Sequence, residues 1–179
     1  MQNLFHIFKL NTHHHYRHID SLSADAEQAF YYYFHHLLPS RKAPVFLCIG
    51  TPLLSADRFG PYIGSQLKKQ DIPNVFGTLE HPVHAENIEF YRNYIQKYYP
   101  NNPVVAIDAS VGTPKQMGCI TLRKGELRPG RAVGKNICPI GHVEITGIFD
   151  NLHDTSAEIF CLFMGHIITQ GIAQNFKAW

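Results

Sequence analysis

The sequence has little charge and no long apolar run. Only 17% of its 179 residues are charged, and the formal net charge is +2. A chain so near neutrality, with no basic run, does not have the composition of a nucleic-acid-binding protein. Its longest apolar segment, residues 159–173, is interrupted by polar residues and is shorter than the ~20 apolar residues of a membrane span. We therefore expect no nucleic acid and no membrane among its partners.

Cysteine is scarce as well. The four cysteines, Cys48, Cys119, Cys138 and Cys161, include no CxxC pair. Cys48 and Cys161 lie in apolar segments, so we interpret them as small buried hydrophobic side chains. Unpaired cysteines fit a reducing compartment, and the N-terminus lacks the basic start and apolar centre of a signal peptide. We expect a cytoplasmic protein.

Hydrophobic residues, by contrast, make up 45% of the chain. This is enough for one soluble globular domain with a sizeable core. We expect a single domain over residues 1–179, in which residues 1–43 form an N-terminal extension and a helix and residues 44–175 form the core. The first 20 residues have no decisive pattern.

Apolar segments alternate with amphipathic ones along the core. We predict strands at residues 44–50, 74–79, 103–108, 118–127 and 141–149, and helices at 26–38, 57–70, 84–99 and from 155 onward. Thr155 and Glu158 form a capping box for the last helix. The order predicts an α/β fold, a three-layer α/β/α sandwich with a mostly parallel twisted sheet, in which ligands bind beyond the C-terminal ends of the strands.

Acidic and imidazole side chains follow three of the predicted strands. Asp57 follows the first strand of the core, Glu80, His81 and His84 follow the second, and Asp108 ends the third. Because parallel strands end at the same edge of a sheet, these groups can meet at one rim. Such a set suits a divalent metal, or two close carboxyl groups that share a proton and activate a water.

Each of these residues also has a purely structural interpretation. Asp57 would cap the helix that follows it, Asp108 would hydrogen-bond the turn after it, and His84 would cap or pack at the start of the next helix.

Other candidate motifs are weaker. Residues 130–135, GRAVGK, have the wrong spacing for a phosphate loop, and Asn136 stands where that motif has Ser or Thr. Ser55 lacks the G-x-S-x-G elbow of a serine hydrolase. The histidine-rich residues 12–18 fit a solvated surface better than a metal site.

Four segments resemble the YyaC-type sporulation proteins of spore-forming Firmicutes, which are related to spore proteases. They are CIGTPLLSADRFGPYIGSQL, VFGTLEHPVHAENI, VVAIDASVG and VEITGIF, and the resemblance covers residues 44–173. It implies a spore-protease-like core with the phosphorylase/hydrolase-like fold of the germination protease and the hydrogenase maturation endopeptidases. In those proteins an acid after the first strand and an aspartate at a later strand end form the active site, and these match Asp57 and Asp108.

The resemblance also implies roles for further residues. The maturation enzymes use a histidine, for which His84 is our first choice, and their acids bind nickel. Glu80 and His142 are second-tier members, since His142 stands where the family pattern has an acid. Arg58 replaces the serine of the family's GDSLGP pattern, and a cation beside Asp57 would hold that carboxyl ionised, which opposes proton sharing.

The leading hypothesis is an endopeptidase-like sporulation protein in the mother cell or forespore. Asp57 and Asp108 would activate a water against a peptide carbonyl, while His84 donates a proton or helps to hold a divalent metal. The alternatives are a non-catalytic scaffold or regulator that binds a peptide or metal, and a small-molecule hydrolase. The expected partner is a protein or peptide substrate, and self-association into a homo-oligomer stays open.

Overall fold

The computed structural model describes residues 16–38, 42–129, 138–151 and 156–177. Their elements are β1 (Tyr16–Asp20), α1 (Ala26–Leu37), β2 (Val45–Cys48), α2 (Phe59–Lys69), β3 (Val75–Phe76), α3 (Ile88–Tyr98), β4 (Val104–Val111), the 3-10 helix η1 (Pro114–Gln116), β5 (Cys119–Lys124), β6 (Val143–Phe149) and α4 (Ala157–Lys177). The segment GRAVGK, the capping residue Thr155 and most of the histidine-rich N-terminus lie outside the described residues.

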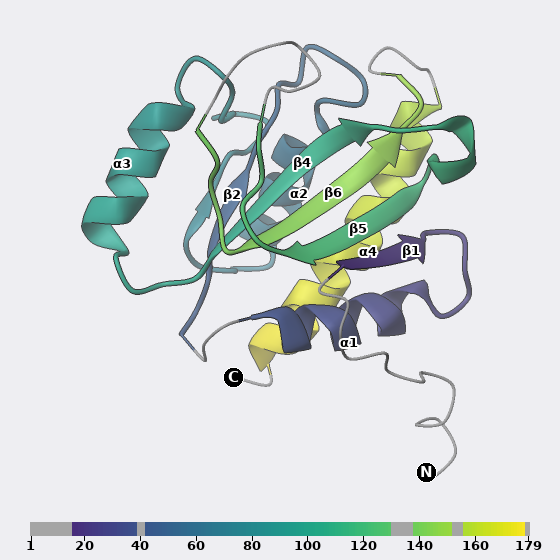
Figure 1. The fold of residues 1–179 in the computed structure, drawn as a ribbon, viewed down its shortest axis with the longest axis horizontal. Helices are drawn as coiled ribbons and strands as arrows, with labels where there is room; N and C mark the ends of the chain where they lie inside the picture. The colour runs from purple at the N-terminus through teal and green to yellow at the C-terminus, as the bar shows by residue number, and fades with distance from the viewer. Residues whose placement is uncertain (1–15, 39–41, 130–137, 152–155, 178–179) are drawn as a thin grey trace, which may run out of the picture.

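The strands form a six-stranded sheet in the order β1-β5-β6-β4-β2-β3 (Figure 1). Strands β6, β4, β2 and β3 are parallel, and β5 and β1 join antiparallel at one side. The predicted α/β class and the mostly parallel sheet are therefore confirmed. None of the helices in the described ranges is long and apolar enough to cross a membrane.

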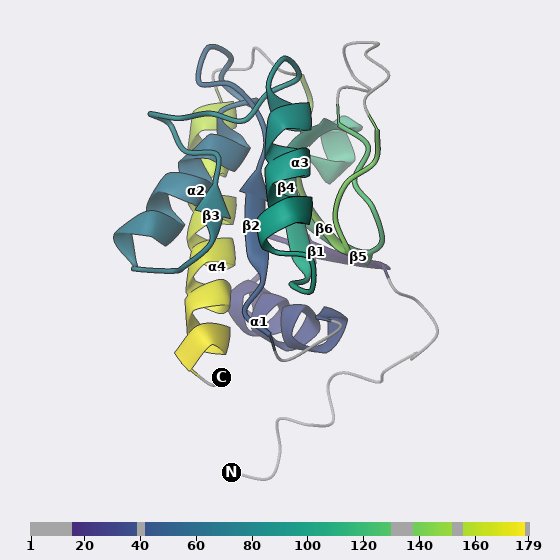
Figure 2. The same ribbon diagram turned by 90° about the vertical axis from the view of Figure 1, so that its left-hand side faces the viewer.

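Helices cover both faces of the sheet unequally. Helices α2 and α4 lie on one face and α3 on the other, with the sheet between them, as Figure 2 shows. Helix α1 also packs on the first face, against α4, where Phe30, Phe34 and Phe59 are fully buried with Phe46 of β2. The second core, beneath α3, is smaller and includes Leu47, Ile88 and Ile95. This is the three-layer arrangement that the alternating pattern predicts.

Two strands differ from the prediction. Strand β1 falls in the segment without a decisive pattern, and it pairs over its full length with β5. Strand β4 does not end at Asp108, because Ala109 to Val111 continue the pairing with Gly147 to Phe149 of β6. Asp108 therefore lies inside a strand, which fixes its backbone more firmly than a loop would.

Candidate functional site

Asp57 lies in the loop between β2 and α2. The backbone N–H of Thr51 donates a hydrogen bond to Asp57 Oδ2 over 2.8 Å. Gly50 has a φ of +139°, and a Cβ atom there would lie 1.9 Å from the carbonyl oxygen of Asp57. Only glycine tolerates this conformation and this close approach. The N-cap residue of α2 is Arg58, and it makes no side-chain capping hydrogen bond. Asp57 therefore does not cap the helix; its carboxyl group is held by the Thr51 N–H of its own loop.

Arg58 does not act on Asp57 as the sequence suggested. Its guanidinium Nη1 pairs with Glu158 Oε1 of α4 at 3.0 Å, and the Arg58 side chain is 35% exposed. The expectation that this cation holds Asp57 ionised is therefore wrong. The pair instead links the start of α2 to the first turn of α4.

Asp108 stands beside β6 on the face of the sheet that α3 covers. It is in register with Thr146 and two residues beyond Ala106, which belongs to the core beneath α3. Its Oδ1 accepts a hydrogen bond from the backbone N–H of Ala109 over 2.8 Å. Asp108 exposes only part of its side chain, so its carboxyl group loses much of its hydration.

A polar row that the sequence did not single out continues from Asp108 across the sheet. Thr146 is in register with Thr121 of β5, and their hydroxyl oxygens lie 2.5 Å apart although both side chains are buried. Two pairs further along the same ladder, Glu144 forms an ion pair with Arg123. The alternation of polar and apolar residues along both strands was a usable signal, because it already assigns these four side chains to one face.

His84 is placed by a contact between two loops. The N–H of Gly50 donates to the carbonyl oxygen of Val83 over 2.8 Å, and Ile49 and Val83 form a parallel bridge. The backbone of His84 is fixed in turn by a 2.8 Å hydrogen bond from its N–H to Asn87 Oδ1. These bonds bring the residue after Val83 to the C-terminal end of β2.

The ring of His84 has one nitrogen already engaged. The backbone N–H of Glu86 donates to His84 Nδ1 over 3.3 Å. A neutral imidazole that accepts at Nδ1 carries its proton on Nε2. The arrangement therefore favours His84 as a hydrogen-bond donor through Nε2.

The two carboxyl groups and the imidazole influence one another electrostatically. Burial raises the pKa of Asp57, although the Thr51 N–H and the nearby His84 oppose this effect. Burial raises the pKa of Asp108 well above its ordinary value, and the negative charges of Asp57 and, more weakly, Glu144 add to it, while the Ala109 N–H opposes it. Asp57 is thus coupled electrostatically both to Asp108 and to His84, and ionisation of Asp57 before Asp108 is favoured.

The second-tier residues do not join this group. His142 precedes β6, and its Nδ1 accepts a hydrogen bond of 2.9 Å from the N–H of Val104 at the start of β4. Asp108 lies four residues further along β4, about 13 Å away at 3.3 Å per residue. Glu80 is exposed in the turn that Thr78 and His81 close with backbone and hydroxyl hydrogen bonds.

The donor set does not favour a metal. Among the residues that the structure describes, no three His, Cys, Asp or Glu side chains converge closely enough to hold an ion. His84 would also have to offer the lone pair of Nε2, yet the Glu86 N–H favours the tautomer with a proton there. A metal at Asp57, Asp108 and His84 therefore remains a prediction, and we route no chemistry through it.

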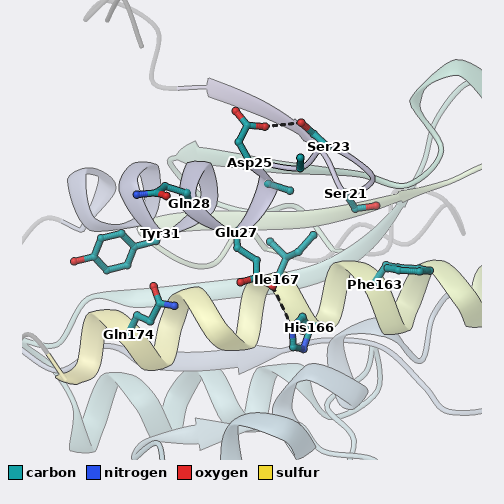
Figure 3. A pocket seen from close by; sticks show the side chains of 12 residues that line it. Ser21, Ser23, Asp25, Glu27, Gln28, Tyr31, Phe163, His166, Ile167 and Gln174 are labelled. Carbon is teal, nitrogen blue, oxygen red and sulfur yellow. Dashed lines mark hydrogen bonds and ion pairs between the residues drawn. The ribbon is translucent and has the colours of Figure 1, made fainter. Parts of the chain in front are cut away.

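A separate groove lies between α1 and α4 (Figure 3), with a volume of about 740 Å³. Its charged groups are paired within it, since Glu27 contacts His166 at 3.1 Å and Ser23 donates to Asp25 over 2.5 Å. It shares no lining residue with the group around Asp108. The electrostatic coupling, and not the size of the hollow, identifies Asp57 and Asp108 as the candidate site.

Two comparisons with known proteins agree with each other. A family model described as "Protein of unknown function (DUF1256)" matches residues 18–167. The chain is 38% identical over 109 residues to "Uncharacterized protein YyaC" of Bacillus subtilis (strain 168). That alignment covers 60% of this chain and 53% of the Bacillus protein, so the chain matches about half the length of its curated relative.

Proposed function

The chain belongs to the DUF1256 family, and we propose that it hydrolyses peptide bonds with Asp57 and Asp108. The observation that carries this proposal is the electrostatic coupling of two carboxyl groups, one in the loop after β2 and one within β4, in which the charge of Asp57 raises the pKa of Asp108. Two coupled carboxyl groups with separated pKa values can supply a base and an acid at the same pH.

The different surroundings of Asp57 and Asp108 assign them different roles in the proposed reaction. Asp57 accepts the Thr51 N–H and lies near His84, so it is the group that is ionised first and acts as the base. Asp57 takes a proton from a water whose oxygen bonds to the peptide carbonyl carbon, while protonated Asp108 donates a hydrogen bond to the carbonyl oxygen. The C–N bond then breaks as the proton on Asp57 passes to the leaving nitrogen, and Asp108 keeps its proton.

His84 supplies a further donor. His84 lowers the pKa of the Asp57 carboxyl electrostatically, against the effect of burial. In the proposed reaction His84 is a positioning residue that keeps Asp57 available as a base. We also propose a role in sporulation, with a protein substrate in the mother cell or forespore, which is supported by the resemblance of four sequence segments to spore-protease-related proteins.

The test is cleavage of a synthetic library of defined decapeptides, read by mass spectrometry. We expect the parent to cleave a subset, and Asp57→Asn and Asp108→Asn each to lose about 10²-fold or more of that activity. Asp71→Asn is a matched control, because Asp71 is exposed and its positive φ of 57° suits asparagine. Cleavage that survives both site substitutions would exclude this pair. Peptide binding without any cleavage would support the non-catalytic alternative instead.

A further inference from the structure

Strand β3 forms the edge of the sheet opposite β1, and a groove follows this edge. The groove has a volume of about 350 Å³. It is lined by Lys68 of α2, residues 75–78, His81, and Phe90, Tyr91 and Tyr94 of α3. An edge strand presents backbone donors and acceptors to whatever lies beside it. The groove therefore combines a backbone template with side-chain walls.

The register shows which backbone groups face the groove. Phe46 of β2 pairs with Val75, and its N–H donates to the carbonyl oxygen of Asn74 over 2.9 Å. In a parallel ladder, alternate residues turn their N–H and C=O groups to the same neighbour. Asn74 and Phe76 therefore face β2, and Val75 between them directs its peptide N–H and C=O away from β2, toward the groove.

The wall formed by α3 is aromatic and exposed. Phe90 is 65% exposed and Tyr94 37% exposed, and the two rings lie 6.3 Å apart between centroids. Tyr94 also contacts the ring of Phe76 at 5.7 Å. Exposed aromatic rings next to one another are typical of interaction surfaces, where they provide large contact area at low entropic cost. The groove is thus suited to one large apolar side chain.

The charge of the groove narrows the choice of occupant. Its lining residues include Lys68 and His81 and no carboxylate. The groove and the candidate site share one loop, because His81 lines the groove and His84, three residues later, is coupled electrostatically to Asp57. A chain bound along β3 would run past the C-terminal end of β2, where Asp57 lies.

We propose that this groove binds an extended peptide as an added strand on β3. One aromatic or large aliphatic side chain of the peptide packs against Phe76, Phe90 and Tyr94, and an acidic side chain lies beside Lys68. The inference rests on the proposed function only in treating this peptide as part of the substrate. The binding of a peptide along β3 is tested independently of its hydrolysis, because a protein that cleaves no peptide can still bind one.

The test uses a displayed library of random heptapeptides, selected on the full chain, and fluorescence anisotropy of the selected peptides. We expect Phe90→Ala and Tyr94→Ala each to weaken binding about 10-fold or more. Phe163→Ala is the matched control, since Phe163 is a 51% exposed aromatic residue of α4 that does not line the groove.

N-methylation of the peptide backbone distinguishes strand addition from simple apolar contact. Methylating alternate residues removes the donors that pair with β3, so one of the two methylated registers should lose binding about 10-fold or more. Equal binding by both methylated peptides and the unmodified peptide would overturn the proposal, as would selected peptides that bind Phe90→Ala and Tyr94→Ala normally. Binding that persists while the parent cleaves no peptide would refute the hydrolysis and leave the groove in place.

Discussion

Replacing Asp108 by asparagine should make the protein more stable at neutral pH. The native environment raises the pKa of this carboxyl well above its ordinary value, first through burial and then through the charge of Asp57. A native state that binds a proton more tightly than the unfolded state loses stability as the pH rises from the unfolded pKa, about 3.9, through the native one. Asparagine is neutral and of the same shape, and its Oδ1 can still accept the Ala109 N–H, so it avoids that loss.

The size of the effect follows from the pKa shift. Each unit by which the native pKa exceeds the unfolded value corresponds to about 1.4 kcal/mol in the free energy of unfolding. In a domain of this size, about 1 kcal/mol changes the Tm by roughly 2–4 °C. Each tenfold gain in the proton affinity of Asp108 on folding should therefore appear as a Tm gain of about 3–6 °C for Asp108→Asn, at a pH above the native pKa.

The assay is thermal unfolding followed by circular dichroism between pH 3.5 and pH 8. The two proteins should have nearly equal Tm values at the acid end, where the carboxyl is protonated in both states, and the variant should gain as the pH rises. Glu126→Gln, at an exposed position, should show no comparable trend. A variant that is less stable than the parent at pH 7, or a difference that does not depend on pH, would show that Asp108 is not a desolvated, coupled carboxyl.

Two further predictions concern the loop before Asp57 and the thiols. Gly50→Ala should lower the free energy of unfolding by about 3 kcal/mol or more in urea titrations, because an added Cβ would overlap the carbonyl oxygen of Asp57 at a positive φ; a loss below about 1 kcal/mol would mean that the loop relaxes freely. Iodoacetamide at pH 8 should label exposed Cys138 at least about 10-fold faster than Cys161, whose pKa burial raises to about 12, or fully buried Cys48, whose pKa burial also raises. Equal labelling rates by mass spectrometry would contradict the buried placement.

The sequence predicts most of this fold because its helices and parallel strands carry local patterns. Helix α3 repeats apolar residues at helical spacing, and β2 is apolar on both faces. Strand β1 could not be predicted in the same way, since only Ile19 of its five residues is an aliphatic side chain in the core. It forms because β5, about 100 residues later, offers a ladder of backbone partners.

The site residues also divide into those that the sequence predicts and those whose placement depends on tertiary contacts. Asp57 and His84 were predicted from one topological rule, that parallel strands end at a common edge, whereas Asp108 lies within β4, three residues before its end. His142 precedes its strand, so the same rule places it at the opposite end. Neighbours in sequence gave no guide to side-chain direction: Arg58 turns from Asp57 to Glu158 in another helix, a contact that only tertiary structure creates.

The single hydrogen bond between Gly50 and Val83 couples the positions of two catalytic candidates. Thr51, the next residue, holds Asp57, and His84 directly follows Val83. A displacement of either loop therefore carries the carboxyl and the imidazole together and preserves their relative placement. Insertions of one residue on either side of this bond would separate them, so the two loops must keep a matched length even though some 30 residues of chain lie between them.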